Sequence, residues 1–471
     1  MVRDLIAMKL NFALWFIRLF AFLVLKVRAF TTRSAAILTK PFRNSELLTM
    51  KDTTRKSVCV VGGGFGGLYS ALKIAGRSDK FTDVYLVDPK DNFVFLPLLY
   101  ELSVGTASTV EVAPRYESLL MGSKVKYLKA AVTNVDFDNK VCKLEQSGSD
   151  HVPESLEFDK LVLSVGIQPR VDLIPGAKEN SLPFYTVSDA FKLKKDLKTL
   201  KASKKPILKV TVIGGGYSGV EVATNVAENL GADRVQVTII DRNEKIMSTS
   251  PDHNRNAASK SLAKRGIVVS YNTTVQSVKE DGLVVVDSTG EPKDVPADLV
   301  LFTAGTEQSN FVKSLDLAKD DFGRILTQKT LQSASNPNIF ALGDCSAVGD
   351  ASNPATAQVA MQQSGVVAKN VLRSIKYERK TNNAITADTV VPNLEEFKYV
   401  SLGEMLTLGD TNAAITSLGG WVKLSGPLAA LSRRTIYAVR MPTVTQSVKA
   451  MVTAGAVTTG KLIGNRFKGG K

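Results

Sequence analysis

Apolar residues gather in short runs along the chain, and two of these runs share one layout. Residues 58–61 and 210–213 are each followed by glycines in the spacing GxGxxG and then by a helical pattern. The glycines are Gly62, Gly64 and Gly67 in the first copy and Gly214, Gly216 and Gly219 in the second. A buried parallel strand, a tight turn and a helix produce this order. The repeat therefore predicts an α/β fold with two nucleotide-binding units.

An aspartate follows each glycine turn at the distance that dinucleotide binding requires. Asp88 ends the next apolar run 21 residues after Gly67, and Asp241 ends one 22 residues after Gly219. A carboxylate there accepts hydrogen bonds from both ribose hydroxyls, while the helix N-terminus receives the pyrophosphate. Two glycine turns that bind nothing would not need these acids. The sequence thus predicts two Rossmann-like domains and two bound dinucleotides.

Two dinucleotides in one chain suggest a permanently held flavin and a visiting nicotinamide nucleotide, between which a hydride passes. We expect FAD in the first unit and NADH or NADPH in the second. Phe65 and Tyr217, which follow the middle glycines, are expected beside the cofactors. Further apolar runs end in small residues at Gly166, Gly305, Gly343 and Asp344. Asp344 is placed to reach a ribityl chain, or else it is a simple turn residue.

Composition excludes several other classes. With 44% hydrophobic and 22% charged residues, the 471-residue chain is globular, and its three cysteines form no CxxC pair. We expect no metal site. The net charge of +15 lies at the ends, since residues 1–43 hold eight Lys or Arg against one Asp and residues 421–471 hold nine and no acid. A neutral body with basic ends favours targeting or membrane contact over nucleic-acid binding.

The N-terminal segment reads as a targeting presequence. The apolar run from Leu10 to Leu25 is interrupted by Asn11 and Arg18 and is short for a membrane span. A single weak membrane anchor is the alternative. The predicted organisation is a presequence and linker (1–55), a first part of the FAD domain (56–175), the NAD(P) domain (176–310), a second part of the FAD domain (311–375) and a C-terminal quinone-site and membrane-surface region (376–471).

Five stretches together resemble the type II NAD(P)H:quinone oxidoreductases: GGGFGGLYSA, NFVFLPLLYEL, GGGYSGVEVA, FALGDCS and TAQVAMQQS. VAPRYESLL, FKYVSLGEMLTLGDTNAAI and LSGPLAALSRRTIYAVRMPT resemble the plastid C-type NAD(P)H dehydrogenase and demethylphylloquinone reductase branch. The resemblance implies hydride transfer from NAD(P)H to FAD and then electron transfer to a membrane quinone, without proton pumping. It also implies a thylakoid or plastoglobule surface in a plastid, with the mitochondrial inner membrane as runner-up.

The resemblance also implies site residues. Pro97 and Leu98 would lie beside the isoalloxazine, and Val359 would contact the cofactor. Gln358 and Gln362 share one helix face and would hydrogen-bond quinone carbonyls; the alternative is two solvated glutamines.

Glu221 and Asp241 belong to the second unit. In the family, a Glu at the position of Glu221 lies near the nicotinamide and the flavin and would assist nucleotide exchange or proton supply. An acid that merely favours a helix start is equally open. The charge of Asp241 favours NADH, while Arg242 could offset it, so we expect NADH with NADPH tolerated.

The chain after residue 425 has an amphipathic helical pattern. Apolar positions lie on one face and basic or aromatic positions on the other: Leu428, Leu431, Thr435, Ile436 and Val439, against Arg433, Arg434, Tyr437 and Arg440. Such a helix lies on an anionic lipid surface. Packing on the body or at a homodimer contact is the alternative.

Two rival functions remain open. A sulfide:quinone reductase needs paired cysteines beside the flavin, and Cys59, Cys142 and Cys345 show no suitable spacing. A flavoprotein that senses redox state or serves as a scaffold would bind nucleotides without turning over quinones.

Overall fold

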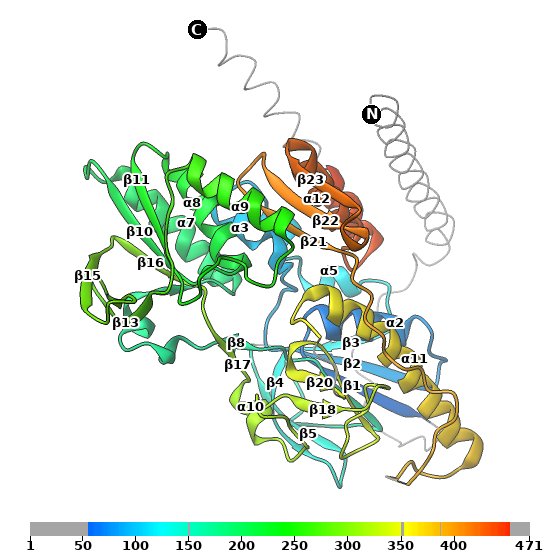
Figure 1. Ribbon diagram of the computed structural model, residues 1–471. Coiled ribbons are helices and arrows are strands. Elements are labelled where there is room, and N and C mark those ends of the chain that lie inside the picture. Colours follow the sequence, from blue (N-terminus) through cyan, green and yellow to red (C-terminus); the bar gives the residue numbers. More distant parts are fainter. Residues whose placement is uncertain (1–54, 149–150, 350–352, 387, 453–471) are drawn as a thin grey trace, which may run out of the picture.

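The computed structural model describes residues 55–148, 151–349, 353–386 and 388–452. The predicted presequence, including the run from Leu10 to Leu25, lies outside these residues, as does the segment 453–471. Two parallel five-stranded sheets dominate the molecule (Figure 1). The first contains, in spatial order, β19 (Ile339–Ala341), β7 (Lys160–Leu163), β1 (Lys56–Val61), β2 (Thr82–Val87) and β3 (Val125–Leu128). The second contains β12 (Val268–Ser270), β11 (Val235–Ile240), β10 (Leu208–Ile213), β16 (Leu299–Phe302) and β9 (Leu182–Pro183).

The two sheets arise from the two sequence repeats. After β1 the chain turns into α2 (Phe65–Ala75), and after β10 it turns into α8 (Tyr217–Leu230). The central strands are buried because helices or further strands cover both faces of each sheet, which explains their uninterrupted apolar sequences. The predicted α/β class with two dinucleotide-binding domains is confirmed.

Smaller antiparallel sheets surround this frame. They consist of β4 (Ala130–Asp136), β5 (Val141–Gln146) and β6 (Ser155–Glu157) on the first unit and of β13 (Thr274–Lys279), β14 (Gly282–Val286) and β15 (Pro292–Pro296) on the second. The chain passes between the units twice, and the two passages pair as β8 (Gln168–Pro169) and β17 (Thr306–Glu307). Two further strands, β18 (Ile325–Thr327) and β20 (Ser346–Val348), pair in parallel.

Helices complete the two units and a third, C-terminal layer. The long helix α11 (Ala357–Thr381) packs along α2 on the first sheet (Figure 1). The C-terminal layer combines β21 (Glu404–Thr407), β22 (Ala413–Ser417), β23 (Val422–Gly426) and α12 (Pro427–Val439). It lies against α8 and against α9 (Asp252–Lys264) of the second unit. The other long helix is α7 (Val187–Ala202), and the short ones are α3 (Leu99–Ser103), α4 (Thr109–Val112), α5 (Tyr116–Leu120), α6 (Ala177–Asn180) and α10 (Asn310–Ser314).

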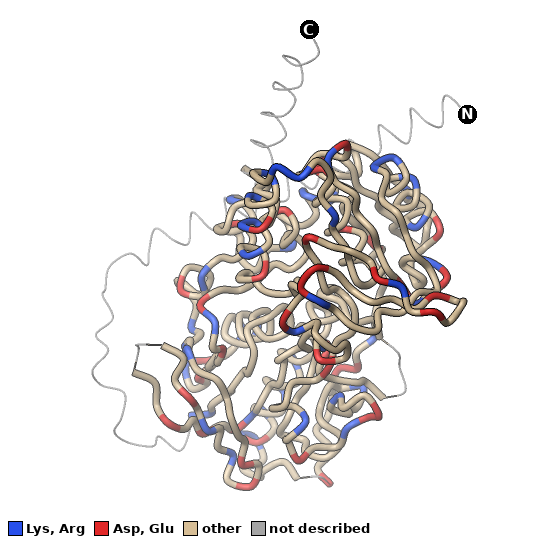
Figure 2. Tube along the Cα trace, turned by 90° about the vertical axis from the view of Figure 1, so that its left-hand side faces the viewer, with Lys and Arg blue, Asp and Glu red and all other residues tan. Residues whose placement is uncertain are grey.

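Charge on the described body is mixed. Figure 2 shows Lys and Arg interspersed with Asp and Glu over the elements of both units. Among the described residues, none of the helices is long and apolar enough to cross a bilayer.

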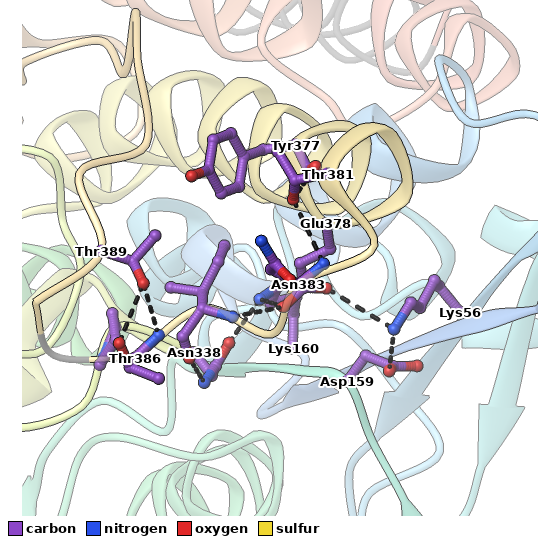
Figure 3. Close-up of polar contacts among 12 residues, drawn as sticks. Lys56, Asp159, Lys160, Asn338, Tyr377, Glu378, Thr381, Asn383, Thr386 and Thr389 are labelled. Carbon is purple, nitrogen blue, oxygen red and sulfur yellow. Dashed lines mark hydrogen bonds and ion pairs between the residues drawn. The ribbon is translucent and has the colours of Figure 1, made fainter.

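A buried polar network connects the end of α11 to the start of β7 in the first sheet (Figure 3). This end of the strands lies opposite the end that leads into the glycine turn. The Lys160 Nζ atom is fully buried, lies 2.8 Å from Glu378 Oε1 and also donates to Asn338. Asn338 in turn donates to the Ile385 carbonyl oxygen at 3.1 Å. The network therefore joins strand, helix and the segment after the helix.

We expect Glu378→Leu to lower the free energy of unfolding by about 3–5 kcal/mol, because it removes the carboxylate that is paired directly with the buried Lys160 ammonium. Denaturant unfolding measures the change. The matched control on the same helix is Lys369→Met, which breaks a half-exposed pair with Glu395 and should cost about 1 kcal/mol or less. Equal losses in the two variants would contradict this role for the network.

Candidate functional site

The two glycine turns have the same geometry and the same demands on side-chain size. A Cβ atom added to Gly67 would lie 1.7 Å from the Gly62 carbonyl oxygen, and one added to Gly219 would lie 1.8 Å from that of Gly214. The third glycine of each turn is therefore required for the close approach of helix and strand. At the middle glycines, Gly64 and Gly216, an added Cβ would meet no atom within 4 Å.

Open space at the middle glycines coincides with free helix N-termini. Gly64 precedes α2 and Gly216 precedes α8, and neither helix has a capping side chain or an acidic residue in its first turn. Unpaired N–H groups and the positive end of the helix dipole thus point at a space that a side chain would fill. This is the arrangement that binds a pyrophosphate.

The two predicted aspartates make matching contacts at these turns. Asp88 accepts hydrogen bonds from the Gly63 N–H at 2.6 Å and the Lys90 N–H at 2.9 Å. Asp241 accepts from the Gly215 N–H at 2.5 Å and the Asn243 N–H at 2.7 Å. Both carboxylates are buried beside the turn, and each oxygen keeps a further lone pair for a ribose hydroxyl.

Asp344 lines a cavity of about 600 Å³ together with Gly343, Val359 and Gln363. Burial raises the pKa of Asp344 to about 6, and within the described part of the chain no donor reaches its carboxylate. The carboxylate can therefore accept hydrogen bonds from a polyol such as a ribityl chain.

Other predicted positions surround the same region. Gly166 and Gly305, which follow β7 and β16, have φ angles of +68° and +75°. The Phe65 ring packs on the rings of Phe93 and Phe95, with centroids 5.1 and 5.3 Å apart. These glycines, aromatic rings and polar atoms fit FAD in the first unit and a nicotinamide dinucleotide in the second.

The segment predicted beside the isoalloxazine forms a 3-10 turn, Leu96–Leu98, that leads into α3. Leu98 is buried, and the Pro97 carbonyl oxygen accepts a hydrogen bond from Arg433 Nη2 at 2.6 Å. Tyr217, at the start of α8, contacts the Glu404 carboxylate of the C-terminal layer.

Glu221 lies at the junction of the second unit and the C-terminal layer. Its Oε1 atom accepts the Thr407 N–H at 2.8 Å and lies 3.9 Å from Arg433 Nη2. Burial, opposed chiefly by Arg433, raises the pKa of Glu221 to about 7. The residue lies beyond the first turn of α8, which begins at Tyr217, so its place does not match that of a helix-start acid. Its carboxyl can gain or lose a proton near neutral pH.

Sequence reasoning missed the charge cluster behind Glu221. Arg433 lies 2.6 Å from one Glu101 carboxylate oxygen, and Arg434 lies 2.7 Å from the other. The prediction that the basic face of α12 meets a lipid surface is wrong for these two arginines, because Glu101, a buried acid of α3, binds both of them. The apolar positions Leu428, Leu431 and Val439 are instead the exposed ones. Two features of the sequence could have indicated this pairing. Glu101 is an acid within the apolar stretch NFVFLPLLYEL, and the helix that it contacts carries basic residues and no acid.

The two glutamines of α11 hold a neighbouring segment. Gln358 donates to the Gly403 carbonyl oxygen at 3.1 Å and accepts the Leu402 N–H at 2.7 Å. Gln362 donates to the Val400 carbonyl oxygen at 2.8 Å and accepts the Val400 N–H at 3.1 Å. Both amides thus position residues 400–403, and their contact with a quinone stays a prediction.

All three cysteines lie in the apolar core. Cys59, Cys142 and Cys345 are free thiols with no exposed surface, and they belong to one hydrophobic cluster of the first unit. Burial raises the pKa of the Cys345 thiol to about 11. This environment disfavours a reactive pair beside the flavin.

Comparison with known proteins agrees with this geometry. Residues 56–364 match the pyridine nucleotide-disulphide oxidoreductase family. The chain belongs to this family. It is 40% identical over 396 residues to the demethylphylloquinone reductase NdbB of Synechocystis, covering 83% of this chain and 93% of that protein.

Two further proteins extend the comparison. The Arabidopsis alternative NAD(P)H-ubiquinone oxidoreductase C1, chloroplastic/mitochondrial, is 34% identical over 426 residues, covering 83% of this chain and 79% of that protein. The structure of NDH2 from Plasmodium falciparum in complex with NADH has the same fold, with a TM-score of 0.73 at 18% identity, covering 85% of this chain and 97% of that one.

Proposed function

We propose that this protein oxidises NADH or NADPH through bound FAD and passes two electrons to a membrane quinone, without pumping protons. The observation that carries the proposal is the open space at two glycines, Gly64 and Gly216, each of which lies beside a buried aspartate. The relatives named as quinone reductases, which match over most of both chains, support the same reaction.

FAD would accept a hydride from the nicotinamide and release electrons singly or in pairs to the next acceptor. The chain's own residues bind and orient. Asp88 and the α2 N-terminus would hold the FAD, and Asp241 and the α8 N-terminus would hold NAD(P)H. Glu221 would supply or receive a proton at its buried carboxyl, since its pKa is about 7.

The function is tested by the two half-reactions measured separately on the purified holoenzyme. Anaerobic NADH should bleach the flavin absorbance, and a short-tailed quinone should restore it. Bleaching without recovery would support a sensor or scaffold, and bleaching by sulfide instead of a nucleotide would support the sulfide:quinone reductase.

Nucleotide choice gives a further prediction. Asp241→Ala should raise the NADPH-to-NADH ratio of kcat/KM by about tenfold, equivalent to ~1.4 kcal/mol, because it removes a charge that repels a 2′-phosphate. Steady-state kinetics measures the ratio. Glu244→Ala, an exposed acid of the same loop, is the control and should leave the ratio unchanged. An unaltered ratio in Asp241→Ala would remove this residue from nucleotide selection.

We further propose that the protein binds a membrane surface through its C-terminal layer, in a plastid at the thylakoid or plastoglobule surface; the mitochondrial inner membrane is the other compartment consistent with the name of the Arabidopsis relative. Large apolar side chains are exposed there: Leu418, Trp421, Leu428 and Leu431. We call these four residues the C-terminal apolar surface. Trp421 is 92% exposed. Such a patch is typical of a membrane interaction site.

The double variant Trp421→Glu/Leu428→Glu should weaken liposome binding by about tenfold or more. Burying one apolar side chain in the membrane contributes ~1.5–3 kcal/mol, and a tenfold change in affinity corresponds to about 1.4 kcal/mol. Vesicle sedimentation measures binding. Phe191→Glu on α7, another exposed aromatic, is the control. Unchanged sedimentation of the double variant would place the membrane contact elsewhere. Point substitutions are the cleaner design, since truncation would also remove Arg433.

A further inference from the structure

Arg440 differs from the other arginines of the C-terminal helix. Arg433 and Arg434 are paired with Glu101, whereas no described carboxylate pairs with the Arg440 guanidinium, which is half-buried. Burial lowers the pKa of Arg440, and nearby tyrosine hydroxyls only partly oppose this effect. A cation that is partly withdrawn from water without a countercharge is costly unless it gains a partner at some stage of function.

The surroundings of Arg440 are those predicted for a quinone. Its carbonyl oxygen accepts a hydrogen bond from the Tyr69 hydroxyl on α2. Tyr437, one helical turn earlier, packs its ring on Phe95 with centroids 5.4 Å apart. Phe95 immediately precedes the turn Leu96–Leu98, which is the segment expected beside the isoalloxazine. Arg440 is thus held next to residues 95–98, the segment expected beside the flavin.

The start of α11 is also close to Arg440, through Tyr399. The hydroxyl of Tyr399 donates to Gln358 Oε1 at 3.2 Å. Tyr69, Tyr399 and Tyr437 are the tyrosines that oppose the lowering of the Arg440 pKa, so all three lie near its side chain. Arg440 is therefore close to the segment expected beside the flavin, through Tyr69 and Tyr437, and to the glutamine-bearing start of α11, through Tyr399. The aromatic side chains gathered there suit a flat ring.

A simpler role for Arg440 is that of a cation at a helix C-terminus, since it directly follows α12. That role requires only a positive charge and is best served in water. It does not account for the three tyrosines near Arg440, which come from α2, α12 and the segment before β21.

We propose that Arg440 is a catalytic residue that binds one carbonyl oxygen of the quinone head group and stabilises the oxyanion formed when that quinone is reduced. The inference rests on the proposed quinone reductase function. The chemical class is a quinone with an unhindered ring carbonyl, whose apolar tail stays in the membrane.

The electron balance defines what Arg440 contributes. Two electrons and one proton from reduced flavin would convert the quinone to a hydroquinone monoanion, and one further proton, supplied by Glu221 or by solvent, would complete the quinol. Arg440 donates hydrogen bonds to the phenolate oxygen but gives up no proton, because a guanidinium stays protonated in proteins. Preorganised donors aimed at a developing oxyanion are among the largest contributions to catalysis.

The residue type matters for this role. A guanidinium offers a rigid, planar fork of donors and stacks on aromatic rings, whereas a lysine ammonium is a compact and strongly hydrated charge. Lysine at 440 would preserve the positive charge at the helix end but not the fork. Arg440→Lys therefore separates the catalytic role from the helix-terminal one.

The test uses the full-length holoenzyme on vesicles and a short-tailed benzoquinone, with each half-reaction followed by flavin absorbance. In Arg440→Gln, bleaching by NADH should stay within about twofold of the wild type, while reoxidation by the quinone should slow by about a hundredfold, as for the loss of one oxyanion donor. Arg440→Lys should recover only part of this loss. Lys198→Gln, which removes a charge from an exposed position of α7, should change neither step.

Three results would overturn the inference. They are an unchanged reoxidation rate in Arg440→Gln, full recovery by lysine, and a loss of thermal stability that slows both half-reactions equally. A wild-type enzyme that no quinone reoxidises would instead refute the proposed function itself, so the two failures are distinguishable.

Discussion

Replacing Gly64 by valine is expected to give a folded protein that no longer retains flavin. A Cβ atom added to Gly64 meets no protein atom within 4 Å, so we expect the fold to tolerate a side chain there. It would fill the space in front of the α2 N-terminus that the FAD pyrophosphate needs. Losing two charge-assisted hydrogen bonds at ~1.5–3 kcal/mol each should weaken FAD binding about a hundredfold or more.

Two matched variants make this prediction specific. Gly216→Val should remain yellow but resist bleaching by NADH, because it fills only the space in front of the α8 N-terminus, where the nicotinamide nucleotide would bind. Gly67→Ala should misfold, since its Cβ would lie 1.7 Å from a carbonyl oxygen. Flavin content, measured by absorbance after gel filtration, and circular dichroism check all three. A fully flavinated Gly64→Val protein would contradict the assignment of FAD to the first unit.

Replacing Arg433 by methionine is expected to cost about 3–5 kcal/mol in free energy of unfolding. The substitution places an apolar side chain beside two buried carboxylates, and it leaves Glu221 without its cation and Glu101 with Arg434 alone. Arg434→Met is the matched control, because Arg434 binds the same Glu101 from a more exposed position. It should cost clearly less in denaturant unfolding. Equal costs would contradict a central role for Arg433.

The pH dependence of the same variants reports on Glu221. Its pKa is about 7 in the folded state against an ordinary value of 4.5, so the folded state binds this proton more tightly than the unfolded state. The stabilisation is complete below pH 4.5 and is lost as pH rises through 7, by up to about 3 kcal/mol. Arg433→Met should move the end of this fall to higher pH, because Arg433 favours the ionised carboxylate. Adding Glu221→Gln should abolish the fall, and an unaltered pH profile would contradict the assignment.

Local sequence patterns were sufficient for the two nucleotide-binding units. The strand, glycine turn, helix and aspartate are close in sequence, and each is required by the geometry of one βαβ unit. The matching contacts of Asp88 and Asp241 with Gly63 and Gly215 follow from that local order.

The C-terminal layer could not be predicted in the same way. The pattern of α12 correctly separated an apolar from a basic face, but a helical pattern does not say which face meets the body. The orientation is decided by the pairing of Arg433 with Glu101, 332 residues apart in the chain. In the same way, Gln358 and Gln362 bind backbone at residues 400–403, which no local spacing indicates.

One chain is proposed to carry the electrons of a nicotinamide nucleotide through flavin to a quinone. The most direct measurement mixes the full-length protein anaerobically with NADH or NADPH and then with a short-tailed quinone while recording flavin absorbance. We expect rapid bleaching, faster with NADH than with NADPH, and rapid recovery on addition of the quinone. Bleaching that persists in the presence of every quinone tried would contradict it.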